Sequence, residues 1–205
     1  MHEAAIKHLA KSDQVLGRLI RKVGPCGLRP GTIRTPFQAL VCSVAHQQLN
    51  GTAANTILGR VVALYPGRSF PAPQDLLKTS DQKLRSAGLS RAKVAAIKDI
   101  AAKTVDGVVP KSRVIAKMSD SEIVARLTTI HGVGPWTVEM LLIFTLGRLD
   151  VLPATDYGVR KGFAVAYRRP KLPAPAELLA HGERWRPYRS IASWYLWRAL
   201  EGTGD

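Results

Sequence analysis

The chain has 205 residues, 46% of them hydrophobic, which is enough for a sizeable buried core and excludes a disordered or fibrous protein. Thirty lysine and arginine residues against fifteen aspartate and glutamate residues give a formal net charge of +15, an excess that favours nucleic acid as a partner over a solvated basic surface without one. No segment is apolar for long enough to span a bilayer, and residues 1–19 lack the apolar region of a signal peptide.

Apolar residues recur at helical spacing almost throughout, and no alternating strand pattern of useful length is present. Helices are expected within residues 1–19, from 36 to about 47, from 51 through 61, at about 74–78 and 80–87, from near 90 through 101, within 119–147, from 156 to about 167, through 178–180 and through 191–196. Residues 35–38 and 119–122 each read as a capping box. We therefore expect an all-α protein of about ten helices, one domain over residues 1–205, with two helical lobes and a cleft between them.

Two helix-like runs in the middle of the chain are joined by a short turn, Gly132-Val133-Gly134. The second helix opens at Pro135, so backbone N–H groups at its N-terminus are left without intrahelical partners. Glycines keep side chains away from these groups, and such a turn can hold a phosphate through Gly132, Val133, Gly134 and Thr137. The ordinary alternative is a helix-turn-helix packing corner.

Four ordered motifs together resemble the helix-hairpin-helix (HhH-GPD) DNA glycosylases, and within them the 3-methyladenine DNA glycosylase II branch. These motifs are residues 47–54, 131–137, 152–157 and 185–190. The resemblance runs from about residue 10 to the C-terminus and places the DNA-binding hairpin at about 119–147. The chain has no room for the N-terminal α/β domain of the longer bacterial enzymes, so it resembles the shorter members. The resemblance implies a monomer that acts on double-stranded DNA.

Asp156 is the candidate catalytic residue. Cleavage of an N-glycosidic bond builds positive charge on the sugar, so a fixed carboxylate stabilises the transition state and can orient the attacking water. Asp156 also precedes a short helix, and the simpler alternative is that it only caps that helix. Its distance from the hairpin matches the family and favours catalysis. A non-catalytic DNA-binding module would have no need of a carboxylate facing a polyanion.

Trp136, Tyr188 and Met140 are the candidate base pocket. Alkylation at a ring nitrogen makes a purine cationic, and the electron-rich face of Trp136 favours a cationic base that has been flipped out of the duplex. Met140 lies one helical turn after Trp136, on the same face. The longer bacterial enzymes have an aromatic residue at the position of Met140, which is a departure from the family pattern. The alternative for Trp136 is a tryptophan that packs two helices together.

Trp136 also occupies the position where bifunctional relatives carry the lysine that attacks the sugar. The resemblance therefore implies a monofunctional enzyme without lyase activity. Two cysteines, Cys26 and Cys42, cannot form an iron–sulfur or zinc site alone, and we expect reduced thiols and no catalytic cofactor in a cytoplasmic, nucleoid-associated protein. A glycosylase for oxidised or mismatched bases is the remaining enzymatic alternative.

An enzyme that flips out a nucleotide must fill the gap in the base stack, and Gln48 and Leu49 are the candidate wedge. The alternative is an ordinary polar helix end before Gly51. Arginines and lysines after Asp156, and Arg184, Arg186 and Arg189, are expected partly to reach phosphates and partly to form a solvated face. The family further implies a Na⁺ or K⁺ ion held by the hairpin carbonyls of Ile130 and Val133, which the sequence itself does not show.

Overall fold

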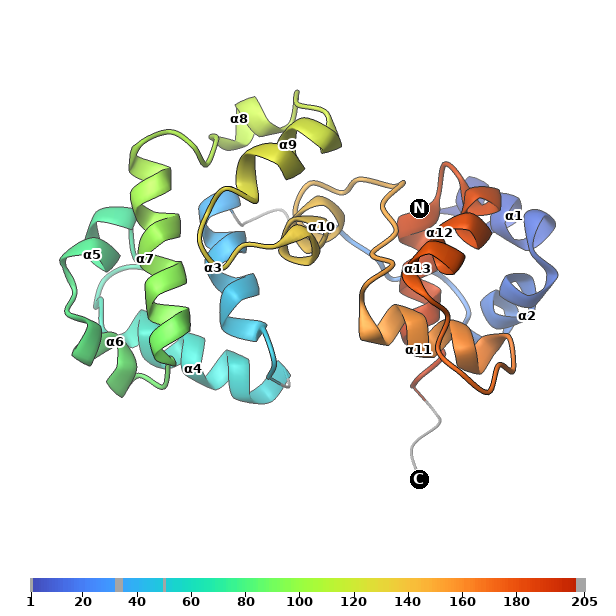
Figure 1. The fold of residues 1–205 in the computed structure, drawn as a ribbon, viewed down its shortest axis with the longest axis horizontal. Helices are drawn as coiled ribbons and strands as arrows, with labels where there is room; N and C mark the ends of the chain where they lie inside the picture. Colours follow the sequence, from blue (N-terminus) through green and yellow to red (C-terminus); the bar gives the residue numbers. More distant parts are fainter. Residues whose placement is uncertain (1, 32–34, 50, 202–205) are drawn as a thin grey trace. The chain divides into compact units, whose positions relative to one another are not determined.

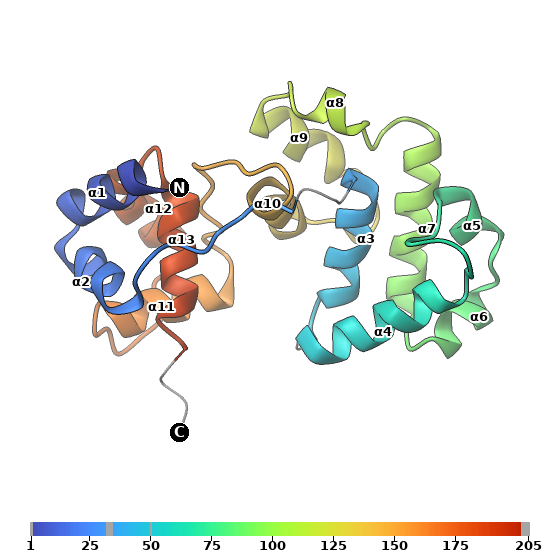
Figure 2. The same cartoon turned by 180° about the vertical axis from the view of Figure 1, so that it is seen from behind.

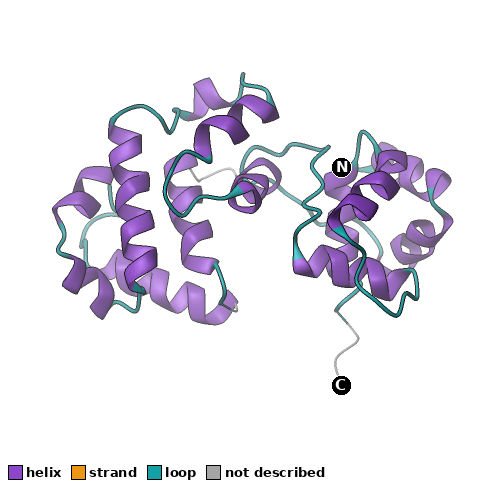
Figure 3. Ribbon diagram, in the orientation of Figure 1, coloured by secondary structure: helices purple, strands orange, loops and turns teal. Residues whose placement is uncertain are grey.

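The computed structural model describes residues 2–31, 35–49 and 51–201, and within these ranges every regular element is a helix (Figure 3). Thirteen α-helices and one short 3₁₀ helix are present in the described ranges, without a strand. The predicted all-α fold is confirmed. About ten helices were expected, and the difference arises mainly because the N-terminal run is two helices and because a short helix follows Lys111.

The chain folds into two compact units, which are coloured continuously along the sequence in Figure 1. The terminal unit comprises the described residues of Met1–Pro30 and Gly147–Asp205, and the middle unit comprises those of Gly31–Leu146. The two lobes expected from the sequence are thus present. The cleft expected between them, and the grouping of residues 1–205 as one domain, stay predictions.

The middle unit is built around α3 (Pro36–His46), which packs against α4 (Gly51–Ala63), α7 (Arg91–Val105) and α10 (Pro135–Phe144). Its remaining helices are α5 (Pro73–Lys78), α6 (Asp81–Ser86), α8 (Ser112–Ile115) and α9 (Asp120–Leu127). Leu40, Val41 and Val44 of α3 are completely buried. Both predicted capping boxes are confirmed, at Thr35–Gln38 and Ser119–Glu122, and they fix where α3 and α9 begin.

The terminal unit joins both ends of the chain, as Figures 1 and 2 show from opposite sides. It contains α1 (Glu3–Ser12), α2 (Gln14–Val23), α11 (Tyr157–Ala166), α12 (Pro175–Gly182), the 3₁₀ helix η1 (Glu183–Trp185) and α13 (Arg189–Arg198). Helix α11 packs closely on α13, since a Cβ at Gly162 would lie 1.9 Å from the backbone oxygen of Leu196. Any larger residue at Gly162 would push these two helices apart.

Asp13 separates α1 from α2 and is a hydrogen-bonding centre of the terminal unit. Its Oδ1 caps α2 by accepting from two backbone N–H groups at 3.0 and 3.1 Å. Its Oδ2 accepts from the Tyr167 hydroxyl, from His181 Nε2 at 2.9 Å and from Trp185 Nε1 at 3.0 Å. Burial raises the pKa of Asp13, but these hydrogen bonds, led by the one from His181, outweigh burial and hold the pKa well below its ordinary value.

Replacing Asp13 with asparagine should lower the free energy of unfolding at pH 7 by about 2–4 kcal/mol, because buried donors lose an ionised acceptor. A depressed folded-state pKa means that the carboxylate's contribution is fully present above the unfolded-state pKa, about 3.9, and is lost as the pH falls toward the folded-state pKa. The difference between wild type and Asp13→Asn in urea unfolding should therefore be smaller at pH 3 than at pH 7.

The matched control is Asp81→Asn, since Asp81 is exposed and pairs only with Lys98 at the surface. That change should alter the free energy of unfolding by less than about 1 kcal/mol at pH 7. A difference for Asp13→Asn that stays the same at pH 3 and pH 7 would contradict the ionised, hydrogen-bonded state of this carboxylate.

Candidate functional site

The hairpin consists of α9, the turn at residues 128–134 and α10, and it can be followed in Figure 1. Gly132 has a φ of 77°, and a Cβ at this position would lie 2.5 Å from Cβ of Ala96 on α7. The backbone N–H of His131 donates to Asp99 Oδ2, also on α7, at 2.7 Å. Glycine at position 132 and the carboxylate at position 99 thus hold the turn tightly against α7.

The predicted phosphate-binding residues occupy different environments in this turn. Gly132 is exposed, Val133 is buried, and its N–H donates to the Ile130 carbonyl at 3.1 Å. Gly134 is the N-cap of α10, supplies no side-chain cap and is followed by Pro135, as the sequence predicts. Thr137 is 1% exposed, so its side chain is an internal contact. A phosphate would therefore meet the backbone of this turn, and its binding stays a prediction.

Gln47 connects the end of α3 to the hairpin. Its Nε2 donates to the Gly132 carbonyl at 3.1 Å and to Thr137 Oγ1 at 3.0 Å. Lys93 of α7 donates from Nζ to the Ala45 carbonyl at 2.9 Å, and burial lowers the pKa of this lysine. In the sequence Gln47 stands out only as part of a motif, and Asp99 and Lys93 do not stand out at all, because contacts between residues 32 to 90 positions apart leave no local signal.

The candidate wedge residues follow Gln47 directly, at the junction of α3 and α4. Gln48 is exposed with a φ of 58°, a left-handed conformation that is uncommon for residues other than glycine. Leu49 is 39% exposed, unusual for a leucine beside a buried helix, and Asn50 lies outside the described residues. Gln48 and Leu49 are exposed, and the hydrogen bonds of Gln47 hold the junction on which they lie. This arrangement suits insertion into the base stack, which stays a prediction.

Trp136 and Met140 line the same cavity, with a volume of about 280 Å³, between α10 and α3. Both side chains are half-buried and lie one turn apart on α10, so the structure brings these two pocket candidates together. The other lining residues come from α3 and the end of α10: Ala39, Cys42, Ser43, His46, Phe144 and Thr145. The size suits one planar base better than a larger ligand.

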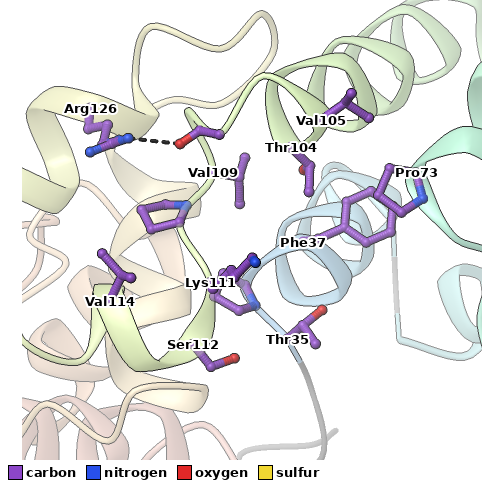
Figure 4. A pocket seen from close by; sticks show the side chains of 13 residues that line it. Thr35, Phe37, Pro73, Thr104, Val105, Val109, Lys111, Ser112, Val114 and Arg126 are labelled. Atoms are coloured by element: carbon purple, nitrogen blue, oxygen red, sulfur yellow. Dashed lines mark hydrogen bonds between the residues drawn. The ribbon is translucent and has the colours of Figure 1, made fainter.

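A larger cavity of about 550 Å³ lies at the opposite end of α3 (Figure 4). Its wall is largely apolar, with Phe37, Val105, Val109 and Val114, and none of the predicted site residues line it. Figure 4 also shows Arg126 turned to a backbone carbonyl, that of Gly107, at 2.8 Å. The predicted pocket residues Trp136 and Met140 line the smaller cavity, so cavity size alone does not mark the predicted site.

Asp156 is the N-cap of α11, and the simple capping role suggested by the sequence is present. Its Oδ1 accepts from the Val159 N–H at 2.7 Å and from Trp197 Nε1 at 2.9 Å. Gly158 allows Trp197 this close, since a Cβ there would lie 2.8 Å from the indole Cδ1. Two donors therefore fix the orientation of the carboxylate, and capping does not exclude catalysis.

The loop before Asp156 is held by a charged cluster around Asp150. Arg189 Nε donates to Asp150 Oδ1 at 2.7 Å and Arg186 Nη1 to Asp150 Oδ2 at 2.8 Å, while both arginines also contact Glu183. Ser190 Oγ accepts from the Val151 N–H at 2.9 Å. In the structure Arg186 and Arg189 pair with acidic residues of their own unit, and contact of either with a phosphate stays a prediction.

Tyr188, the third pocket candidate, is the N-cap residue of α13, and its ring meets His8 edge to face with centroids 5.5 Å apart. Tyr188 belongs to the terminal unit, whereas Trp136 and Met140 belong to the middle unit. The joining of these three side chains in one base pocket stays a prediction.

The described part of the chain contains no group of three or more histidine, cysteine, aspartate or glutamate side chains that could hold a metal ion. The carbonyl of Ile130 accepts the N–H of Val133, and binding of Na⁺ or K⁺ by the carbonyls of these two residues is untested. None of the described helices is both long enough and apolar enough to cross a membrane.

The chain is similar to known proteins along most of its length. Residues 41–187 match the HhH-GPD superfamily of base excision DNA repair proteins. The chain belongs to this superfamily. It is 38% identical to DNA-3-methyladenine glycosylase 1 of Schizosaccharomyces pombe over 93% of this chain and 84% of the relative. It is 33% identical to the alkylbase DNA glycosidase-like protein mag2 of the same organism, over 96% and 93% of the two chains.

Solved structures of superfamily members agree with this assignment. The S. pombe 3-methyladenine DNA glycosylase Mag1, in complex with abasic DNA, matches with a TM-score of 0.92 and 37% identity over 98% of both chains. The DNA-3-methyladenine glycosidase of Bacillus halodurans matches with a TM-score of 0.82 and 35% identity, over 97% of this chain and 89% of that one.

Replacing Gln47 with alanine should weaken binding to duplex DNA about tenfold, equivalent to the ~1.4 kcal/mol of one or two net hydrogen bonds. The reason is that the hairpin turn loses its link to the wedge junction. Fluorescence anisotropy with a labelled duplex would measure the change, and Gln82→Ala on the exposed face of α6 is the matched control. Equal affinity of Gln47→Ala and wild type would show that this link does not position the hairpin.

Proposed function

We propose that this chain is a monofunctional DNA glycosylase that hydrolyses the N-glycosidic bond of alkylated purines, of the 3-methyladenine type, in duplex DNA. The carboxylate of Asp156 carries the proposal, because two hydrogen bonds orient it at the start of α11 and binding alone would not need it. Membership of a base excision repair superfamily, and similarity to relatives named as 3-methyladenine glycosylases, give the substrate class.

The proposed reaction begins with extrusion of the damaged nucleotide. Backbone N–H groups of the hairpin turn grip a phosphate, and Gln48 with Leu49 fills the gap left in the base stack. The flipped base stacks on Trp136 beside Met140, and the cationic charge of an alkylated purine strengthens its attraction to the indole face. Tyr188 is the third side chain proposed to contact the base.

Bond cleavage then needs little acid catalysis, because an alkylated base already carries positive charge and leaves readily. As the bond to the base breaks, positive charge develops on the sugar, and the ionised Asp156 stabilises it and orients a water for attack. The Trp197 and Val159 donors hold Asp156 Oδ1, so the carboxylate needs no reorganisation during the reaction. The products are the free base and an abasic site.

We also propose that the enzyme has no lyase activity. The side chain one residue after Pro135 is an indole, which cannot form a Schiff base with the sugar. We further propose that the protein acts as a monomer in the cytoplasm, at the nucleoid, and that it needs no catalytic cofactor. A monovalent cation at the carbonyls of Ile130 and Val133 would support the hairpin turn structurally.

Asp156→Asn should lower the rate of base release by at least about a hundredfold, as expected when one electrostatic stabiliser of a transition state is removed. Binding to duplex DNA should stay equal or become tighter, because the variant keeps the cap-forming oxygen and removes a charge that repels phosphate. The rate at which each protein releases methylated base from methylated duplex DNA checks the first expectation, and its affinity for duplex DNA checks the second. Excision near the wild-type rate would refute the catalytic role.

Borohydride should trap no covalent complex between the enzyme and a lesion-containing duplex, and strand breaks should appear only after heat or alkali. Lys161, exposed on α11, is the first lysine after Asp156 and so the nearest amine in sequence that could form a Schiff base. A trapped adduct that disappears in Lys161→Ala would overturn the monofunctional assignment. Lys171→Ala, another exposed lysine in the loop after α11, is the control.

A further inference from the structure

Among the described residues, His46 is the only histidine that lines the cavity of Trp136 and Met140. Most of the remaining wall is apolar or weakly polar, with Ala39, Cys42 and Phe144 among its residues. A single strongly polar ring in such a pocket is the group best able to distinguish one bound base from another. The proposed reaction itself makes no use of His46.

The hydrogen bond of His46 to its own helix fixes which ring nitrogen is an acceptor. Nδ1 lies 2.8 Å from the backbone oxygen of Cys42, and a carbonyl oxygen can only accept, so Nδ1 carries the hydrogen. The neutral imidazole then has its lone pair on Nε2. Within residues 2–31, 35–49 and 51–201 no other group forms a hydrogen bond with this nitrogen.

We propose that His46 is a specificity-determining residue that accepts a hydrogen bond from the exocyclic amino group of a flipped alkyladenine. This inference rests on the proposed function and narrows it to adenine-type lesions over guanine-type lesions. A purine enters a pocket with the edge farthest from its sugar, where adenine presents an amino donor and guanine a carbonyl acceptor. The lone pair of His46 Nε2 can accept a hydrogen bond from the adenine amino group, whereas it repels the guanine carbonyl oxygen.

Two physical effects make this contact selective. The amino group of a cationic alkyladenine donates more strongly than a neutral one, since charge-assisted hydrogen bonds are the stronger class. A guanine carbonyl placed against Nε2 would leave two acceptors facing each other, and a polar group that the bound base covers without pairing is costly. The pocket therefore discriminates both by the bond it makes and by the mismatch it imposes.

The test compares release of 3-methyladenine with release of 3-methylguanine from methylated duplex DNA. The wild type should favour 3-methyladenine, and the ratio of the two rates should fall about tenfold in His46→Phe, which keeps an aromatic ring without nitrogen. His46→Gln should retain release of 3-methyladenine while releasing 3-methylguanine faster than wild type, because its amide can present either a donor or an acceptor. A loss of structure would lower both rates without changing their ratio.

A second measurement on the wild-type protein does not depend on folding of the variants or on catalysis. Free 3-methyladenine should shift the ¹⁵N resonance of His46 Nε2, and free 3-methylguanine should leave it in place. If the wild type releases neither base yet free 3-methyladenine shifts this resonance, the proposed function fails while the His46 contact stands. A ratio unchanged in His46→Phe, together with an unshifted resonance, would overturn the inference.

Discussion

The close contact between the hairpin turn and α7 is the constraint on which the position of the hairpin in the middle unit depends. Gly132 lies so near Ala96 that a side chain at position 132 would collide with it, and the left-handed φ of Gly132 is a second requirement that glycine meets. Asp99 and Gln47 then hold the two sides of the turn by hydrogen bonds to its backbone. The position of α10, and with it Trp136, follows from this fixed turn.

The candidate catalytic carboxylate is fixed by an independent arrangement in the terminal unit. Asp156 caps α11 and accepts a hydrogen bond from the indole N–H of Trp197, in the last turn of α13, while α11 packs on α13 through Gly162. At the other end of α11, Tyr167 donates to Asp13, whose network ties the first two helices to the last ones. Helix α11 is therefore held at both ends, which gives the candidate catalytic carboxylate a rigid support.

Local signals in the sequence predicted much of this fold, because capping boxes and glycine turns act over a few residues. Thr35 and Ser119 marked their helices correctly, and the Gly132-Val133-Gly134 turn was found with its proline. The break at Asp13 was missed, since apolar periodicity continues across it and the carboxylate is stabilised by residues more than 150 positions away. Asp99 and Gln47 were missed for the same reason, because each contacts the hairpin turn from a distant part of the sequence. His46 was missed because its place on a cavity wall leaves no signal in the sequence.

The most direct measurement of the central claim is identification of what the wild-type protein releases from a methylated duplex. Chromatography of the reaction should show free 3-methyladenine accumulating with time, and the treated strand should remain full length until it is heated or exposed to alkali. Tight binding to the methylated duplex with no free base in solution would contradict the account, and would leave a DNA-binding protein in place of an enzyme.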